Sequence, residues 1–356
     1  MRALSVYLGR EAARQTAQEG WSADLFSLLL GASGGPKWFI LARLDRLLFG
    51  DFLQRSERTL SVFGSSIGSW RHACLAMPDP VAALDALESA YLNQHYASKP
   101  TAAEVSAVSR DILRRVLGDG GAGVLANHPR VHTHIVTARG RGPAAASSSP
   151  LLATGMGAAG LGNAIHRRLL SAQFQRVVFH SQDAANPGLA LDDFATRYCR
   201  LREDNVEAVL HASGAIPFVL TGERDIAGAP PGQYWDGGII DYHFDLGQYC
   251  GEGLMLYPHF SAAVVPGWFD KFLPWRHAAI HEFDKLVLLC PSAEFTADLP
   301  FGKIPDRSDF KRLPHAERVG YWEQCIARAG ALAEEFAELL QGPDPLRGVT
   351  LLAGTS

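Results

Sequence analysis

The 356-residue chain has few cysteines, and their spacing forms no recognisable metal or disulfide pattern. The five are scattered, odd in number and include no C-x-x-C pair; they are Cys74, Cys199, Cys250, Cys290 and Cys325. This arrangement argues against a disulfide framework and against a thiolate zinc site. A reducing compartment fits such cysteine usage best.

The chain also lacks a strong charge of either sign and any long apolar run. It has 33 basic and 37 acidic residues, a net charge of −4, and no basic run stands out. This balance argues against nucleic-acid binding. No run approaches the length of a transmembrane helix, and Met1–Gln15 has no signal-peptide core. We therefore expect a cytoplasmic protein, with peripheral membrane contact left open.

The chain does have a large apolar fraction, with 47% hydrophobic residues, enough for one large domain or two smaller ones. Leu25–Leu30 and Leu60–Phe63 are short apolar runs, each followed by a glycine-bearing turn and a helix-compatible segment. Two such strand–turn–helix units in succession predict an α/β fold with a largely parallel sheet. We find no internal repeat and no linker, so a single domain, 1–356, is the preferred interpretation.

Periodicity and turn residues predict the remaining elements. Helices are expected over Glu11–Glu19, Trp38–Phe49, Trp70–Met77, Pro80–Tyr96, Ala102–Leu117, Met156–Ala172, Asn205–Ala212 and Pro314–Gln341. Strands are expected over Val131–Ala138, Gln175–His180, Leu254–Tyr257 and Lys285–Cys290, and loops over Arg139–Pro150 and Tyr234–Ile240.

Gly64–Gly68 reads G-x-S-x-G between a predicted strand and a predicted helix, which is the context that gives this motif its meaning. The flanking glycines lack a Cβ, so strand and helix can approach closely around a strained serine. The hydroxyl of Ser66 is then exposed at a helix N-terminus, where a developing anion is favoured. Ser66 is therefore the candidate nucleophile, although glycine and serine are also common in ordinary turns.

Two further glycine-bearing segments supply candidates for the rest of an acyl-transfer site. In the loop before Trp38, the backbone N–H groups of Gly34 and Gly35 can stabilise an oxyanion, and Lys37 adds positive potential. A plain glycine turn before a helix is the alternative interpretation. Asp236 lies in an Asp-Gly-Gly turn, and a carboxylate acts as a base when burial and a hydrogen bond raise its pKa. None of the thirteen histidines lies in a motif that nominates it for a triad.

Four blocks, in this order, resemble the patatin-like phospholipase family: Gly34–Lys37, Gly64–Gly68, Ala212–Pro217 and Asp236–Gly238. The resemblance covers residues 25–245 and implies a three-layer α/β/α architecture with a mainly parallel central sheet. It also implies a Ser-Asp dyad, an oxyanion hole in the first block, and hydrolysis of acyl esters, often of phospholipids, without metal or cofactor. Trp38 replaces the glycine usual after the basic residue, which puts the oxyanion donors in question. Residues 246–356 have no assigned role and are expected to pack on the same domain.

Three functions stay open at this point. The first is a lipid acyl hydrolase, the second a small-ester carboxylesterase or thioesterase, and the third a catalytically silent lipid-binding protein of the same fold. Trp268, Phe269, Phe272 and Trp275 crowd together in 264–277. If exposed, they suit a lipid interface or a lid over an acyl pocket; if buried, they cover the core.

Several other patterns are weaker. Gly155–Gly160 matches G-x-G-x-x-G but follows no clear strand, so close helix packing is preferred to a dinucleotide site. A phosphate-binding P-loop at Lys37 is rejected because Pro36 and Trp38 flank it. Two sets of polar residues alternate along predicted strands: His132 with His134, and Asp241 with His243 and Asp245. Either set is a candidate metal site, but ordinary strand polarity is the favoured interpretation. The second set is close in sequence to Asp236, so its members are also candidates to support that residue.

Overall fold

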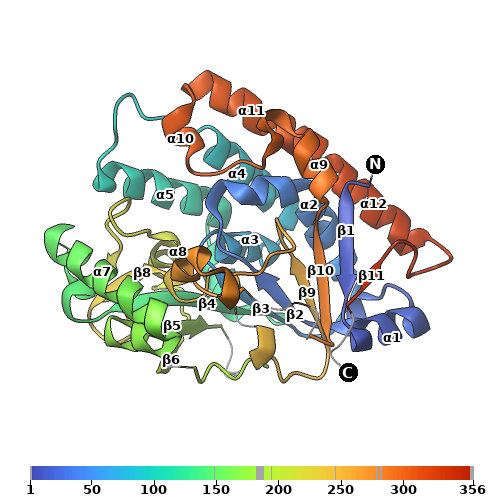
Figure 1. Ribbon diagram of the computed structural model, residues 1–356, viewed down its shortest axis with the longest axis horizontal. Coiled ribbons are helices and arrows are strands. Elements are labelled where there is room, and N and C mark those ends of the chain that lie inside the picture. The colour runs from blue at the N-terminus through green and yellow to red at the C-terminus, as the bar shows by residue number, and fades with distance from the viewer. Residues whose placement is uncertain are drawn as a thin grey trace.

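The computed structural model describes residues 2–147, 149–181, 188–193, 195–244, 246–277, 280 and 283–352. These residues form an 11-stranded, mainly parallel sheet flanked by helices, which confirms the predicted three-layer α/β/α fold (Figure 1). The strands are β1 (Leu4–Leu8), β2 (Phe26–Gly31), β3 (Leu60–Ser65), β4 (Val131–Gly140), β5 (Phe174–His180), β6 (Thr196–Arg200), β7 (Glu223–Arg224), β8 (Gln233–Asp236), β9 (Leu254–Pro258), β10 (Leu286–Pro291) and β11 (Thr350–Leu351).

The α-helices are α1 (Arg10–Glu19), α2 (Ala42–Gly50), α3 (Ile67–Leu75), α4 (Pro80–Leu92), α5 (Ala102–Leu117), α6 (Gly121–Asn127), α7 (Ser149–Ile165), α8 (Val206–Gly214), α9 (Ala293–Asp298), α10 (Asp309–Arg312), α11 (His315–Arg328) and α12 (Gly330–Gln341). Short 3-10 helices relevant to the site are η2 (Gly35–Leu41), η4 (Gly142–Ala145), η5 (Arg167–Ala172), η6 (Gly237–Ile239), η8 (Trp268–Phe272), η9 (Pro274–Arg276) and η11 (Pro300–Gly302).

The strand order is β11-β1-β10-β9-β2-β3-β4-β5-β6, with β8 pairing β4 and β7 pairing β8. The central strands β2 and β3 are parallel and almost entirely buried, as expected for apolar runs covered on both faces. Gly31 pairs with Gly64, so the carboxyl ends of β2 and β3 lie side by side. The loops that follow, which carry Gly34 and Ser66, therefore meet at one edge of the sheet, where open α/β sheets bind their ligands.

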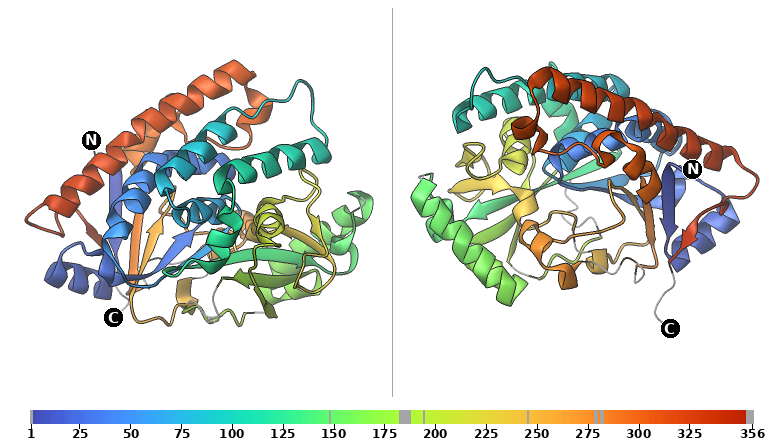
Figure 2. Two further views of the ribbon diagram at one scale, coloured as in Figure 1. Left: turned by 180° about the vertical axis from the view of Figure 1, so that it is seen from behind. Right: turned by 45° about the horizontal axis from the view of Figure 1, so that its top comes forward.

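Helices α3 and α8 pack directly on the sheet strands, and α4 and α5 pack outside them. Helices α11 and α12 run along one side of the molecule, where α12 contacts α2 and β1 (Figures 1 and 2). A single large hydrophobic core lies on both faces of the central strands. A second, smaller core lies beneath α7 and includes Leu170, Trp235 and Ile240, with Phe269 packed against it.

Most predicted elements are confirmed with shifted ends, but several predictions were wrong. Pro314–Gln341 is not one helix, because Ala329 separates α11 from α12 and glycine, a weak helix former, begins the second. The predicted loop Arg139–Pro150 instead contains the end of β4, η4 and the start of α7. Pro150 lies in the first turn of α7, where its missing N–H costs nothing.

Three further boundaries differ. The helix predicted over Met156–Ala172 begins at Ser149, ends at Ile165 and is followed by η5. The loop predicted over Tyr234–Ile240 contains β8 and η6. The helix predicted from Trp38 begins as η2 before it becomes α2. The strands β6, β7 and β11 and the strand β1, which pairs with β11 on one side, were not predicted, since short strands at or next to an edge of the sheet have little pattern of their own.

Candidate active site

Ser66 lies at the turn between β3 and α3 in a backbone conformation that is uncommon for a residue other than glycine, with φ 56° and ψ −130°. Three hydrogen bonds hold this turn. The Ser66 N–H donates to Ser213 Oγ at 2.9 Å, and that hydroxyl donates to the carbonyl of Val136 at 2.7 Å. The Ser69 hydroxyl donates to the Ser66 carbonyl at 2.7 Å. The strained conformation is therefore supported from both α3 and α8.

The glycines of the G-x-S-x-G motif allow α3 to approach β2 and β3. A Cβ added to Gly68 would overlap the carbonyl of Gly31, and one added to Gly64 would lie 2.7 Å from the Ser69 Cα. Both contacts involve backbone atoms, which cannot move aside cheaply. The close approach predicted from the motif is confirmed.

The side chains of Ser66 and Asp236 meet although 170 residues separate them. The Ser66 hydroxyl donates to Asp236 Oδ2 at 2.9 Å, and the Gly238 N–H donates to Oδ1 at 2.7 Å. Both side chains are buried, at 2% and 6% exposure. Burial raises the pKa of Asp236, while the charge of Arg307 and the two hydrogen bonds act in the opposite direction. In the described part of the chain, no histidine hydrogen-bonds to either side chain.

Strand β8 places Asp236 opposite Thr137 of β4, at the same edge of the sheet as Ser66. The Asp236 N–H donates to the carbonyl of Ala215 at 2.9 Å, which links the aspartate to the Ala212–Pro217 block. A Cβ added to Gly237 would overlap the carbonyl of Val136, so the glycine is required where β8 passes β4. The Asp-Gly-Gly turn thus has a packing reason as well as a candidate chemical one.

The glycine loop lies beside Ser66. Gly35 has a φ of 56° and begins η2, so its N–H has no acceptor within that helix. Gly35 lines the same pocket as Ser66. The Ser33 hydroxyl donates to Ser65 Oγ at 3.0 Å and ties the loop to the serine turn. A Cβ added to Gly34 would lie 2.7 Å from the ring of Phe260, so this position also requires glycine.

Lys37 lies against the ring of Phe260, which also lies beside Gly34. Its ammonium lies 4.8 Å from the ring centroid of Phe260, and burial lowers its pKa. Among the described residues it makes no hydrogen bond or ion pair with Ser66 or Asp236. The neighbouring Trp38 is buried at 1% exposure and packs at 4.9 Å on Phe39, so it belongs to the core.

Three residues at the site carried no role in the sequence-based prediction. Ser213 lies within a block that the resemblance named, so its position was marked but its contact with Ser66 was not. Arg307 lies against Gly35, since a Cβ added there would be 2.6 Å from its Nε, and its charge lowers the pKa of Asp236. The Lys271 ammonium lies 3.7 Å from the ring centroid of Tyr242, and burial lowers the pKa of Lys271 to about 7. The last two are single basic residues of the C-terminal part, with no motif around them.

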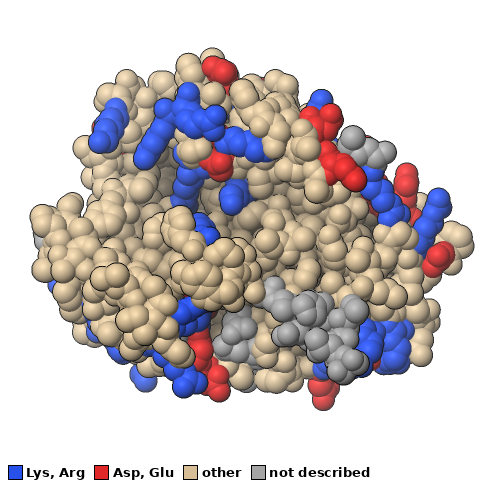
Figure 3. Space-filling model, viewed as in Figure 1, with Lys and Arg blue, Asp and Glu red and all other residues tan. Residues whose placement is uncertain are grey.

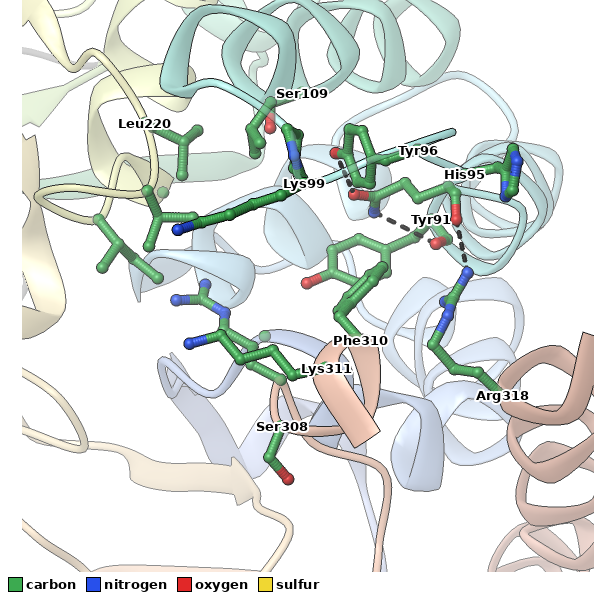
Figure 4. A pocket seen from close by; sticks show the side chains of 18 of the residues that line it. Tyr91, His95, Tyr96, Lys99, Ser109, Leu220, Ser308, Phe310, Lys311 and Arg318 are labelled. Atoms are coloured by element: carbon green, nitrogen blue, oxygen red, sulfur yellow. Dashed lines mark hydrogen bonds between the residues drawn. The ribbon is translucent and has the colours of Figure 1, made fainter. Parts of the chain in front are cut away.

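Ser66 lines a pocket of about 980 Å³. Figure 4 shows this pocket from close by. Its size is that of a site for a drug-sized or larger ligand. One wall is apolar and is formed by Ile67, Trp70, Val105, Ile216, Val219 and Leu220. Tyr91 and Phe310 also line the pocket, from α4 and α10.

The weaker patterns have structural explanations. Arg176 donates to both carboxylate oxygens of Asp241, at 2.7 and 2.8 Å, in a buried ion pair. His243 Nδ1 accepts the N–H of Val265. Asp245 lies outside the described residues, and within them no three His, Cys, Asp or Glu side chains are arranged to hold a metal.

The G-x-G-x-x-G segment lies inside α7 rather than between a strand and a helix. A Cβ added to Gly155 would overlap the Ala144 backbone, so the preferred interpretation, close helix packing, is confirmed at this glycine. This placement leaves no strand–loop–helix unit for a dinucleotide.

Comparison with known proteins identifies the family of the chain. Residues 39–243 match the patatin-like phospholipase domain. The match includes Ser66, Ser213 and Asp236 but begins after Gly34 and Gly35. No curated protein and no solved structure shows significant similarity to the chain. Because the matched range is more than half of the 356 residues, the chain belongs to the patatin-like phospholipase family, whose members are lipid acyl hydrolases.

Proposed function

We propose that this protein hydrolyses acyl esters of lipids through an acyl-serine intermediate, with Ser66 as nucleophile and Asp236 as general base. Membership of the family supports action on lipid esters. The assignment of the two residues rests on one observation, the 2.9 Å hydrogen bond from the buried Ser66 hydroxyl to Asp236. That distance is within the range required for direct proton transfer.

In the acylation step, Asp236 Oδ2 takes the hydroxyl proton as Ser66 Oγ attacks the ester carbonyl carbon. The oxyanion that forms accepts hydrogen bonds from the N–H groups of Gly34 and Gly35, with that of Ile67 at the start of α3. The ester C–O bond then breaks, and the leaving alcohol takes the proton from Asp236. In deacylation, Asp236 takes a proton from water, the hydroxide attacks the acyl carbon, and Ser66 Oγ regains the proton as it leaves.

The surroundings of Asp236 suit this role. Burial raises its pKa and makes it a stronger base than an exposed aspartate, while Arg307 keeps the ionised form accessible. The N–H of Gly238 fixes Oδ1 at 2.7 Å, so that Oδ2 is the oxygen that faces the serine. A hydrogen bond thus orients Asp236, and its surroundings set its pKa.

The pocket favours a lipid substrate over a small ester. Its volume of about 980 Å³ and its apolar wall suit a long acyl chain. An intact, hydrogen-bonded dyad argues against a catalytically silent lipid-binding protein. We therefore place the lipid acyl hydrolase ahead of a small-ester carboxylesterase or thioesterase.

A fluorophosphonate probe tests the nucleophile and the base. We expect wild type and Ser98→Ala, a pocket serine outside the hydrogen-bonded cluster, to be labelled. Ser66→Ala should lose the label entirely, and Asp236→Asn should slow labelling by at least about a hundredfold. Equal labelling of wild type and Ser66→Ala would contradict the proposal. Comparing short and long acyl esters, with and without vesicles, then separates lipid hydrolysis from small-ester hydrolysis.

We extend the proposal to peripheral contact with a lipid surface through η8 and η9. Phe272 and Trp275 are 76% and 74% exposed, and Trp268 is 37% exposed. Phe269 differs, because it packs against the second core. Exposed aromatic side chains of this kind favour a water–lipid boundary.

The adjacent end of α7 enlarges this surface. Leu161 and Ile165 are 73% and 78% exposed, and Arg276 of η9 donates to the carbonyl of Ala164 at 3.4 Å. Lys271, which directly precedes the exposed Phe272 in η8, is close enough to Asp236 to lower its pKa. The exposed apolar surface of η8, η9 and α7 therefore adjoins a residue whose charge acts on Asp236.

Vesicle sedimentation tests this contact. The double variant Phe272→Ser/Trp275→Ser should bind phospholipid vesicles at least about fivefold more weakly than wild type, since two large aromatic side chains leave the interface. Phe301→Ser, which removes an exposed aromatic of η11, is the matched control and should bind normally. Unchanged vesicle binding of the double variant would contradict the proposal that η8 and η9 contact a lipid surface.

No helix among the described residues has the length and apolar character needed to span a bilayer. Separately, all five cysteines are free thiols. Free thiols agree with a reducing compartment, so we propose a cytoplasmic location with reversible contact at a membrane surface.

A further inference from the structure

The pocket in front of Ser66 has a second wall that differs in chemistry from the apolar one. Lys99, Arg307 and Lys311 line it, together with His95 and His315. No aspartate or glutamate lines the pocket in the part of the chain that the structure describes. This wall therefore carries several positive charges without a carboxylate to balance them inside the cavity.

Lys99 and Lys311 approach from different parts of the fold. Lys99 belongs to the segment between α4 and α5, whereas Lys311 belongs to α10. Figure 4 shows both side chains extending into the same part of the pocket from these two segments. Neither makes an ion pair or a hydrogen bond with any described residue. Both lysines are available to a ligand.

Neighbouring charges are already engaged. Arg318, which also lines the pocket, donates to the carbonyl of Leu92 at 3.4 Å and lies over the ring of Trp322. Lys303 forms ion pairs with Asp306 at 2.8 Å and Asp309 at 2.7 Å. Asp306 and Asp309, which neighbour Arg307 and Lys311 in the sequence, are thus paired with Lys303, and the positive charge of Lys311 and Lys99 stays on the pocket wall.

The same distribution is visible on the surface. In the space-filling view, Lys and Arg side chains gather around and inside the hollow at the upper part of the molecule, with few acidic ones among them (Figure 3). The chain as a whole has a net charge of −4. A basic pocket in an acidic protein concentrates an anionic ligand at this position.

We propose that Lys99 and Lys311 bind a phosphate group of the substrate, so that the preferred substrate is an acyl ester whose head group has a net negative charge. Its ester carbonyl lies at Ser66 and its acyl chain on the apolar wall. Arg307, which lines the pocket and lies against Gly35, links the charged wall to the reacting groups. This inference rests on the proposed function, because it names the substrate class of the same site.

Phosphate suits this wall better than a neutral or zwitterionic head group. A phosphate monoester carries close to two negative charges near neutral pH and offers three acceptor oxygens. Lysine binds phosphate as a point charge, and two lysines from different elements can share one such group. A choline head group would bring its own cation to the same wall and be repelled.

A matched set of water-soluble substrates tests the inference. We would compare hexanoylglycerol, its 3-phosphate and its 3-phosphocholine ester below their micelle concentrations, so that interfacial binding contributes nothing. The 3-phosphate should have the highest kcat/KM, about tenfold above the neutral ester at low salt, and the advantage should shrink as salt is added. Hexanoyl-coenzyme A is the fourth substrate of the comparison. Its kcat/KM, set beside that of the 3-phosphate, distinguishes recognition of a phosphate carried by coenzyme A from recognition of a phosphate carried by a lipid head group.

Two variants connect the preference to its residues. Lys99→Gln and Lys311→Gln should each lower kcat/KM for the phosphate ester about three- to tenfold, mainly through KM, and leave the neutral ester within twofold. Arg312→Gln is the matched control, because Arg312 is an exposed cation on α10 that does not line the pocket. It should behave as wild type on all substrates.

The outcomes separate the two proposals. Equal hydrolysis of neutral and phosphate esters, or equal loss on both in the lysine variants, would overturn the phosphate inference while the hydrolase assignment stands. If no ester is cleaved, the proposed function fails. Titration of the Ser66→Ala protein with the phosphate ester then decides the inference by itself, since binding must weaken when Lys99 or Lys311 is also replaced.

Discussion

Ser66 is kept in the left-handed region of backbone space by groups that lie far away in sequence. Its N–H donates to Ser213 Oγ, which in turn donates to the carbonyl of Val136. Such strain costs about 1–3 kcal/mol and persists only where surrounding contacts hold it. The position of the nucleophile therefore depends on α8 and β4 as much as on its own motif.

Ser213→Ala tests this dependence. The change leaves the buried N–H of Ser66 without its acceptor, at a cost of about 1–3 kcal/mol. We expect kcat for ester hydrolysis to fall at least about tenfold with little change in KM, because orientation and not binding is lost. Ser98→Ala, in the same pocket, should keep wild-type kcat; a variant Ser213→Ala with unchanged kcat would show that the turn is self-supporting.

Replacing Lys271 tests how neighbouring charge sets the pKa of Asp236. Its charge lowers the pKa of Asp236, so a neutral replacement removes a group that favours the ionised carboxylate. Lys271→Met should therefore move the acid limb of the kcat/KM profile to higher pH, since a larger fraction of Asp236 is protonated at any given acidic pH. At those pH values Lys271 is charged in wild type, because burial lowers its pKa only to about 7. If the acid limb of the Lys271→Met profile stays in place or moves to lower pH, the assignment of Asp236 as the general base is contradicted.

At the scale of elements, the packing of α3 on β2 depends on the glycines of the serine turn. A Cβ on Gly68 would overlap the carbonyl of Gly31, whereas Gly157 on α7 has no atom within 4 Å of such a Cβ. The two glycines form a matched pair, one in a tight contact and one in open space, both within helices.

Gly68→Ala should lower the free energy of unfolding by more than about 2 kcal/mol, because backbone atoms must separate to admit the methyl group. Gly157→Ala should raise stability by up to about 1 kcal/mol, since alanine favours a helix more than glycine does. Urea denaturation of both variants measures the difference. Similar stabilities for the two variants would mean that α3 can shift without cost.

Element prediction succeeded where local pattern and tertiary environment agree. The apolar runs that became β2 and β3 are buried on both faces, and the glycine turns that follow them were predicted together with the strands. Prediction failed over Arg139–Pro150, where low complexity concealed the end of β4 and the start of α7. It also failed at β8, because a four-residue strand beside Asp-Gly-Gly has the composition of a turn.

At the scale of the whole molecule, residues after 245 contribute to the centre of the sheet. Strand β9 pairs with β2, and β10 lies between β9 and β1. Arg307, from the same part of the chain, lines the pocket with Ser66. We infer that the chain folds as one unit and that the region matched by the family does not form an independent domain.

Truncation tests that inference. A chain of residues 1–245 would leave one edge of β2 unpaired and separate β1 from the sheet, exposing a buried core. We expect it to be aggregated or unfolded by circular dichroism and unreactive toward a fluorophosphonate probe. A folded, probe-reactive fragment would show that residues 246–356 form an accessory layer only.

The sequence by itself determined the fold class, the serine turn and the candidate pair Ser66 and Asp236. The α/β fold class and the serine turn follow from short-range chemistry, since buried strands need apolar runs and tight turns need glycine. The pairing of Ser66 with Asp236 was implied by the resemblance of four ordered blocks to the patatin-like phospholipase family. Only the tertiary structure decided what surrounds that pair. The support from Ser213, the charges of Lys271 and Arg307 and the lysines Lys99 and Lys311 come from distant segments whose side chains have no local pattern. Distance and burial set the pKa of a base and the charge of a pocket wall, and both arise only when the sheet brings these segments together.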